Sequence, residues 1–134
     1  FFIHLILFRC QGFVQGRVLE ELMSNCCVYV LPSDIEGMSI SLLEAMSCGV
    51  RCLVSDIEEN VDVSGGYAAS FPKGNIAMLQ SCLERILGED GRLHDREGQI
   101  AFIREKYSWD YAAAEHLRVY EQAAEKKQSR KKLK

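Results

Sequence analysis

Short apolar runs alternate with longer stretches of helical periodicity along this chain. Each short run is closed by a turn residue, which predicts a buried strand. The predicted strands are 27–31, 51–55 and 67–71. The longer stretches carry apolar residues at helical spacing and predict helices at 40–46, 76–88, 92–107 and 108–124. Alternating strands and helices favour parallel βαβ units, so we expect an α/β fold with flanking helices and a helical C-terminus.

Polar residues mark where two of the predicted helices should begin. Asn75 and Ser108 each precede an apolar stripe and suit the N-cap position, where a side-chain oxygen accepts a backbone N–H. The last helix should pack through Trp109, Ala112, Leu117 and either Tyr120 or Ala124. Its inner face should be partly exposed if a partner domain normally covers it. The acidic stretch 56–63 is expected to form a loop or a short helix.

The first eight residues, Phe1 to Phe8, form an apolar run that does not begin with Met. A secretory signal competes with a strand here, but no basic segment or small-residue cleavage site accompanies the run. The run is also too short to span a membrane, which takes about 20 residues. We therefore expect a strand, a cytoplasmic location, and a chain that is a fragment of a longer protein.

Size and charge predict one domain followed by a basic tail. The chain has 134 residues, 48% of them apolar, which is enough for a single core. Residues 126–134 carry six of the 16 basic residues and none of the 19 acidic ones. We expect a domain at 1–125 and a disordered tail at 126–134. Such a tail could contact an anionic membrane surface peripherally, whereas the acidic body argues against nucleic acid as a partner.

The cysteines do not form a metal or disulfide pattern. No C-x-x-C pair occurs, and the three histidines do not complete a zinc motif. We expect reduced, buried thiols that act as small hydrophobes, and no bound metal. The six cysteines are Cys10, Cys26, Cys27, Cys48, Cys52 and Cys82.

Two carboxylates flank the turn between the first predicted strand and the helix after it. Glu36 and Glu44 lie eight residues apart, and Gly37 follows the first of them. A helix N-terminus leaves backbone N–H groups unpaired and carries about half a positive charge, so it suits a phosphate. A carboxylate can accept hydrogen bonds from two hydroxyls of one sugar ring. The corner could therefore hold a diphosphate, with a sugar near Glu36 and a ribose near Glu44.

A purely structural interpretation of the same residues stays open. The sequence from Ser41 to Glu44 matches a capping box, in which Glu44 would return a hydrogen bond to the first turn of the helix. Glu36 could be an ordinary acidic loop residue. The spacing alone does not decide between these interpretations.

The residues around the corner carry a family resemblance. The string comprises Pro32-Ser33, Glu36-Gly37, Ser41-Leu42-Leu43-Glu44-Ala45-Met46, Gly49 and Val54-Ser55-Asp56. It resembles the glutamate-x7-glutamate motif of the GT-B glycosyltransferases of family 4. The resemblance extends over residues 11–124. It includes a glycine loop at Gly12-Phe13-Val14 and an aromatic-Ser-Trp helix start at Tyr107-Ser108-Trp109.

The resemblance implies a Rossmann-like sheet within the C-terminal donor domain of a two-domain enzyme. The implied reaction transfers a sugar from a nucleotide diphosphate donor to the hydroxyl of a carbohydrate or lipid acceptor. It proceeds with retention, without a cofactor and usually without metal. Glu36 would be the catalytic residue that holds the donor sugar, Glu44 would hold the ribose, and Val14 would lie by the base. The diphosphate would lie on the backbone of Gly37, Met38, Ser39 and Ile40.

Parts of the family pattern are missing from this chain. The N-terminal acceptor domain and the family's basic residues for the diphosphate are not matched. Arg17 opens a helix on the wrong side of the glycine loop, and Lys73 follows Pro72 in a later turn. Because a departing diphosphate needs charge stabilisation, we expect the chain alone to be a weak nucleotide binder and not a competent transferase. A non-catalytic nucleotide-sugar-binding remnant and a sugar-nucleotide epimerase are the alternatives.

Overall fold

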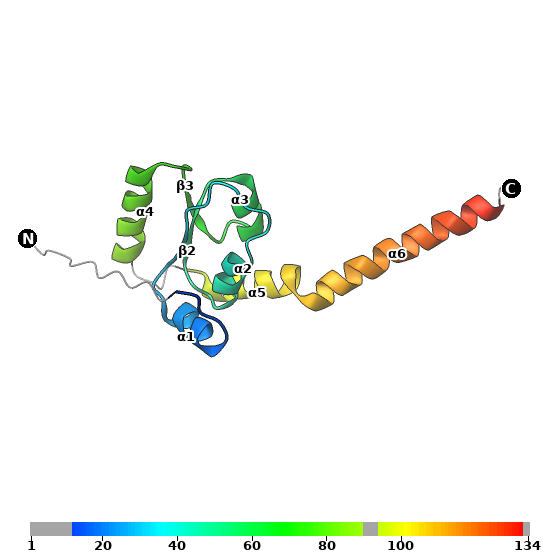
Figure 1. Cartoon of the computed structure of the whole chain (residues 1–134), viewed down its shortest axis with the longest axis horizontal. Coiled ribbons are helices and arrows are strands. Elements are labelled where there is room, and N and C mark those ends of the chain that lie inside the picture. Colours follow the sequence, from blue (N-terminus) through cyan, green and yellow to red (C-terminus); the bar gives the residue numbers. More distant parts are fainter. Residues whose placement is uncertain (1–11, 90–93, 133–134) are drawn as a thin grey trace, which may run out of the picture.

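The computed structural model describes residues 12–89 and 94–132, with side chains as far as residue 127. Helices and short strands alternate along the described residues, and a pair of helices follows (Figure 1). The elements are α1 (Arg17–Asn25), β1 (Tyr29–Leu31), α2 (Ile40–Ser47), β2 (Cys52–Ser55), α3 (Glu58–Ser64), β3 (Ala69–Phe71), α4 (Ile76–Gly88), α5 (Arg96–Tyr107) and α6 (Trp109–Lys132). The strand predicted within residues 1–8 lies outside the described residues.

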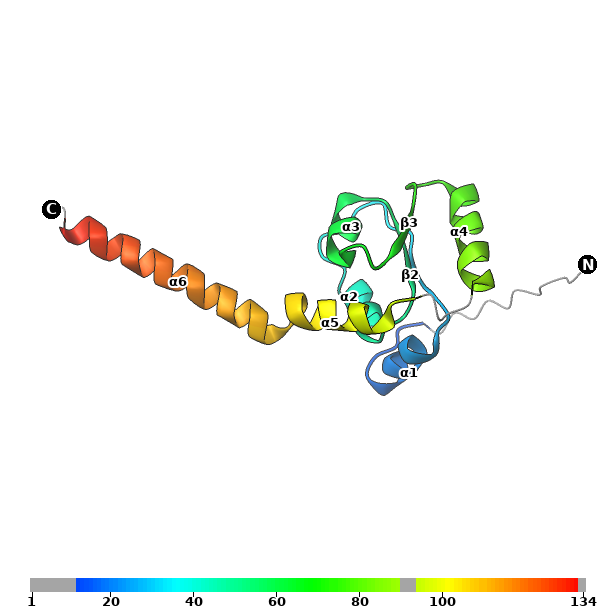
Figure 2. The same ribbon diagram turned by 180° about the vertical axis from the view of Figure 1, so that it is seen from behind.

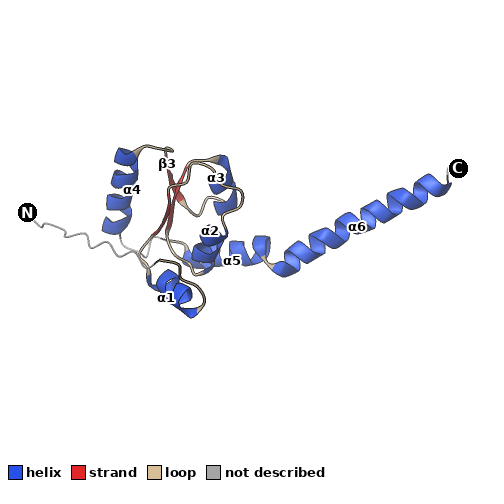
Figure 3. Cartoon of the chain, viewed as in Figure 1, coloured by secondary structure: helices blue, strands red, loops and turns tan. Residues whose placement is uncertain are grey.

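The three strands form one parallel sheet in the order β1-β2-β3. Val30 pairs with Leu53, and Leu53 pairs in turn with Ala69. Helix α4 covers one face of this sheet, and α2 and α3 cover the other (Figure 3). The predicted α/β class, with a Rossmann-like parallel sheet and flanking helices, is confirmed.

Successive side chains of β2 point to opposite faces of the sheet, which divides the core into two clusters. Cys52 and Val54 point towards α2, α3 and α5, where they pack with Leu42, Met46 and other apolar side chains. Leu53 points the opposite way, into a smaller cluster with Phe71 and Ile86 that α4 closes. All four residues of β2 are buried, as a central strand between two helical layers requires.

Helix α5 holds the end of α2 in place through one buried polar side chain. Gln99 is fully buried, and its Nε2 donates hydrogen bonds to the carbonyl oxygens of Met46 (2.9 Å) and Val50 (3.1 Å). These carbonyls lie where α2 ends and the chain turns into β2. The helix predicted from residue 92 begins at Arg96 in the described residues, after an N-cap at Asp95.

Helix α6 projects away from the α/β body (Figures 1 and 2). Trp109 is 89% exposed and Leu117 and Tyr120 are also exposed, so the predicted packing of these side chains is wrong within this chain. The expectation of a partly exposed inner face is met. Helix α6 continues as far as Lys132 and so extends into the segment 126–134, which was expected to be a disordered tail. None of the described helices has both the length and the apolar character that crossing a bilayer requires.

The described cysteines are free thiols, but they are not uniformly buried. Cys52 is buried in β2, and burial raises its pKa to about 12. Cys26 and Cys27 are exposed, which contradicts the expectation that all of the cysteines act as core residues. The difference follows from their place after α1, at the surface where the chain enters the sheet. Cys10 lies outside the described residues.

Candidate functional site

Three connections meet at the edge of the sheet where the strands end. The first is the loop 32–39 between β1 and α2, which carries Glu36 and Gly37. The second begins at Asp56 after β2, and the third is the turn 72–75 after β3. In open parallel sheets, ligands bind outside the carboxyl ends of the strands. The structure therefore places the predicted motif at the edge where a ligand is expected.

The carboxylate of Glu36 is held by its own loop. The side chain is half-buried, and Ser33 Oγ donates a hydrogen bond of 2.5 Å to Glu36 Oε1. The loop itself is held from β2, because Ser55 Oγ donates to the Ser33 carbonyl at 2.5 Å. Ser55 is in turn held by Asn60, whose Nδ2 donates to Ser55 Oγ at 3.1 Å. Asn60 and Ser55 are both buried, so this chain of contacts begins in the core and ends at Glu36.

Ser39 caps helix α2. Its backbone is extended, and its hydroxyl accepts the N–H of Leu42 at 3.4 Å. The structural interpretation of Ser41 to Glu44 as a capping box is therefore wrong, because the cap lies two residues before Ser41. The first N–H groups of a helix have no partner within the helix, so those of Ile40 and Ser41 remain available at this N-terminus. This is the group of donors that can receive a phosphate.

Tyr29 contacts the first turn of α2. Its hydroxyl forms a hydrogen bond of 2.7 Å with Ser41 Oγ, which lies in the first turn of α2. Burial raises the pKa of Tyr29 above its usual value, and the negative charges of Glu36 and Glu44 raise it further, against the Ser41 hydrogen bond. Tyr29 therefore keeps its proton and remains a neutral hydroxyl at the start of α2. Neither Tyr29 nor Ser41 could be recognised as a site residue from the sequence alone.

Glu44 faces a cleft between α1 and α2. The cleft has a volume of about 270 Å³ and is also lined by Gly16, Leu19, Met23 and Ser47. Gly16 is the N-cap of α1 and lies two residues after Val14, which is half-buried in the glycine loop. The structure thus brings Glu44 and Gly16, which follows the glycine loop, to one cleft. Met38 lies in the loop after β1, and Ile40 is the first residue of α2. Both side chains are exposed.

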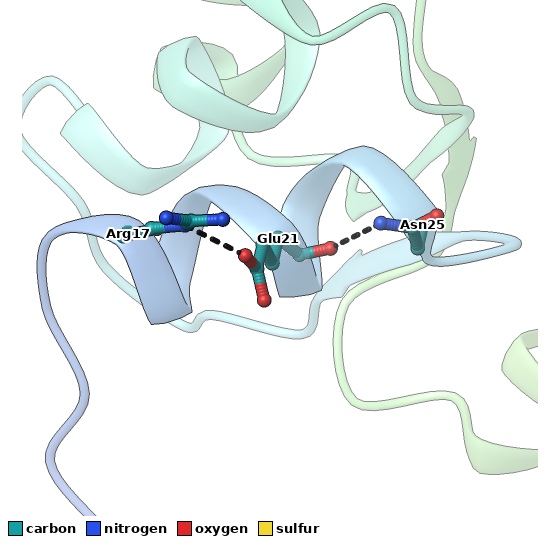
Figure 4. Close-up of polar contacts among 3 residues, drawn as sticks. All are labelled: Arg17, Glu21 and Asn25. Atoms are coloured by element: carbon teal, nitrogen blue, oxygen red, sulfur yellow. Dashed lines mark hydrogen bonds and ion pairs between the residues drawn. The ribbon is translucent and has the colours of Figure 1, made fainter.

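Two cations outside the predicted motif, Arg17 and Lys73, differ in the partners that they contact. Arg17 Nε pairs with Glu21 Oε1 at 2.9 Å along the surface of α1, where Asn25 also donates to the Glu21 carbonyl (Figure 4). Its charge is thus compensated within α1. Lys73 behaves differently, because its Nζ donates to the carbonyl of Asp34 at 2.6 Å. Lys73 does lie in the later turn that follows Pro72, and from there it contacts the loop that carries Glu36.

A parallel sheet with helices on both faces, and a capped helix after its first described strand, defines an α/β domain whose expected ligand site is the carboxyl edge of the sheet. A comparison with known protein families identifies the family to which this chain belongs. The chain belongs to the glycosyl transferases group 1 family, which it matches over residues 7–89. The match includes the glycine loop, the Glu36 to Glu44 corner and all three strands.

Relatives among characterised and uncharacterised proteins carry glycosyltransferase names. An uncharacterized glycosyltransferase of Methanocaldococcus jannaschii is 33% identical over 120 residues, which cover 85% of this chain and 30% of the relative. The N,N'-diacetylbacillosaminyl-diphospho-undecaprenol alpha-1,3-N-acetylgalactosaminyltransferase of Campylobacter jejuni is 34% identical over 105 residues, covering 77% and 28%. The serotype-specific mannosyltransferase WbdA of Escherichia coli is 29% identical over 108 residues, covering 81% and 13%. The chain therefore spans less than a third of the length of these relatives.

Proposed function

We propose that this chain is the donor-binding part of a retaining GT-B glycosyltransferase of family 4. It binds a nucleotide diphosphate sugar for transfer of the sugar to an acceptor hydroxyl. The observation that carries the proposal is the corner between β1 and α2. There, Glu36 and the available N–H groups of Ile40 and Ser41 lie at the carboxyl edge of the sheet. The family match over residues 7–89 supports the same assignment.

Each part of the donor has a residue of matching chemistry. The diphosphate lies at the N-terminus of α2, on the backbone from Gly37 to Ile40 and in the field of the helix dipole. Glu36 accepts hydrogen bonds from hydroxyls of the donor sugar, and Ser33 fixes the direction of its carboxylate. Glu44 accepts from the ribose hydroxyls in the cleft beside Gly16. Val14, in the glycine loop, lies by the base.

The acceptor is a hydroxyl of a carbohydrate, free or linked to a lipid. The name of the Campylobacter jejuni relative, which includes diphospho-undecaprenol, supports a lipid-linked acceptor. Acceptor binding and the transfer step belong to the longer proteins of the family, in which a second domain faces the donor. Within these 134 residues we propose weak donor binding without turnover, and binding that needs no metal. Peripheral contact with an anionic membrane through the basic C-terminus is a further part of the proposal.

Nucleotide binding by the chain is the first test. We expect UDP, GDP or ADP at millimolar concentration to shift the backbone amide resonances of Gly37 to Ile40. These amides are the proposed diphosphate donors. Amides of α4, on the other face of the sheet, serve as the internal control. If none of the three nucleotides moves the Gly37 to Ile40 resonances, the proposal fails, and so does the alternative of a non-catalytic binding remnant.

Two substitutions separate the proposed roles of the glutamates. Glu44→Ala should abolish the preference of the chain for UDP over 2′-deoxy-UDP, or for the equivalent pair of the base that binds. Glu36→Gln should leave that preference intact and instead remove the added affinity that a donor sugar gives over the bare nucleotide. Glu97→Ala, which changes an exposed acid of α5, is the matched control. Unchanged preferences in both site variants would refute the assigned roles.

A further inference from the structure

Lys73 connects the end of β3 to the loop that carries Glu36. It lies in the turn after β3, and its Nζ donates a hydrogen bond of 2.6 Å to the carbonyl of Asp34, 39 residues earlier. Its own backbone N–H donates to Asp56 Oδ1 at 2.8 Å. Among the described strands, β2 lies between β1 and β3. Lys73 therefore reaches across the end of β2 to contact the loop that follows β1.

We propose that Lys73 is a positioning residue for Glu36, which it holds in place through the carbonyl of Asp34. The inference rests on the proposed role of Glu36 in binding the donor sugar. It assigns Lys73 a part in selecting the sugar, although Lys73 lies outside the Glu36 to Glu44 motif.

The hydrogen bonds of the loop explain why one lysine can have this effect. The loop is held at two successive carbonyls, that of Ser33 by Ser55 and that of Asp34 by Lys73. The Ser33 hydroxyl then fixes the Glu36 carboxylate. Ile35, between the second carbonyl and Glu36, is 84% exposed and gives the loop no anchor in the core. Without Lys73, the hydrogen bond at the Ser33 end is the one that still ties this segment to the sheet among the described contacts.

The backbone of Lys73 is itself fixed, which makes the contact directional. A lysine side chain has four rotatable bonds and loses considerable conformational entropy when it is held in one place. The hydrogen bond from the Lys73 N–H to Asp56 fixes the start of the side chain at the end of β2. Asp56 is itself held, because its own N–H donates to the Phe71 carbonyl at 2.9 Å. The three strand ends are thus joined in one set of contacts.

A direct role as a phosphate cation is the competing explanation for Lys73. The ammonium has three N–H donors, and the Asp34 carbonyl takes one of them. The two roles predict different ligand dependence. A positioning residue for Glu36 affects binding of the nucleotide sugar but not of the bare nucleotide, whereas a phosphate cation affects both equally.

The test compares Lys73→Met, Lys73→Arg and the wild-type chain. Lys126→Met, which removes one exposed charge from α6, is the matched control. In the absence of nucleotide, Lys73→Met should lower the backbone NMR order parameters of residues 34–37 and shift the Asp34 carbonyl resonance. Lys73→Arg should restore both, because it keeps a charged donor, and Lys126→Met should change neither. Unaltered order parameters and carbonyl shift in Lys73→Met would overturn the inference.

The second measurement uses UDP with UDP-glucose, GDP with GDP-mannose, and ADP with ADP-glucose. Lys73→Met should weaken the nucleotide sugar about 2- to 10-fold, the range of one net hydrogen bond, and leave the bare nucleotide unchanged. Equal weakening of both ligands would overturn positioning in favour of direct phosphate binding. If the wild type binds none of these ligands, the proposed function fails by itself. The order parameters still decide whether Lys73 holds the loop.

Discussion

Ser55 and Ser33 are joined by a hydrogen bond of 2.5 Å, from the hydroxyl at the end of β2 to the carbonyl at the start of the Glu36 loop. The two residues are 22 positions apart in the sequence. Ser55 is 1% exposed and also accepts a hydrogen bond from Asn60. The end of the central strand thus determines where the candidate site begins, and core stability and site geometry depend on the same hydroxyl.

Replacing Ser55 by Ala should reduce both stability and donor binding. The change leaves the Ser33 carbonyl without its donor, and an unsatisfied polar group costs about 1 to 3 kcal/mol. We expect the free energy of unfolding in urea to fall by that amount. Ser81→Ala is the control, because Ser81 also donates to a carbonyl, but on the exposed face of α4. It should change stability by less than about 0.5 kcal/mol. Equal effects of the two substitutions would contradict the importance of Ser55.

The cap of α2 predicts a contrast between Ser39 and Glu44. Ser39→Ala removes the oxygen that accepts the Leu42 N–H and should cost about 0.5 to 2 kcal/mol of stability. Glu44→Ala should cost less than about 0.5 kcal/mol, because Glu44 is exposed and does not cap the helix. Urea unfolding followed by far-UV circular dichroism measures both. A larger loss of stability in Glu44→Ala than in Ser39→Ala would instead indicate a capping box formed by Ser41 and Glu44.

Two adjacent glycines differ in what surrounds them. Gly65 and Gly66 both have positive φ angles, 57° and 87°. A Cβ on Gly66 would meet nothing within 4 Å, whereas one on Gly65 would lie 2.2 Å from Cζ of Phe102. Gly66→Ala should therefore cost only the left-handed backbone penalty of about 1 to 2 kcal/mol. Gly65→Ala should cost about 1 to 3 kcal/mol more, because the Phe102 ring must move. Similar unfolding midpoints for the two variants would argue against this packing.

His94 should make stability depend on pH. Burial lowers its pKa below the usual value, and the charge of Arg51 lowers it further. The unfolded chain therefore takes up a proton more readily than the folded one. The stabilising contribution is complete above the ordinary pKa of about 6.5 and is lost as the pH falls through the folded pKa.

Substitution of His94 tests this dependence. His94→Gln should lose less stability than the wild type between pH 7 and pH 5, as measured by urea unfolding at several pH values. His116→Gln is the matched control, since His116 is exposed on α6 and bonds only to the nearby Ala112 carbonyl among the described contacts. A pH profile of His94→Gln that coincides with those of the wild type and the control would show that His94 does not contribute.

Local features of the fold could be predicted from the sequence, because they depend on neighbouring residues. Asn75 caps α4 by accepting the N–H of Met78, and Ser108 accepts the N–H of Tyr111 at the start of α6. Both caps were predicted, since a cap needs only a polar side chain and a helix that begins beside it. The strand positions followed equally from short apolar runs bounded by turns.

The supporting contacts of the site could not be predicted in the same way. Tyr29 meets Ser41 across 12 residues, and Lys73 meets Asp34 across 39. Neither contact leaves a periodic signal, because each depends on which strand ends meet at one edge of the sheet. The resemblance located Glu36 and Glu44, but it assigned no role to Ser33 or Ser55, although both lie within the same string. The roles of the glutamates and of Val14 stay predictions until binding is measured.

The single tryptophan of the chain is Trp109, which is 89% exposed at the start of α6. An indole surrounded by water emits at nearly the same wavelength in folded and unfolded protein. Intrinsic fluorescence is therefore a poor reporter of the unfolding of the α/β body. The same exposure makes it a sensitive reporter of contact: a blue shift of the emission would reveal any surface that covers the start of α6, without an added label.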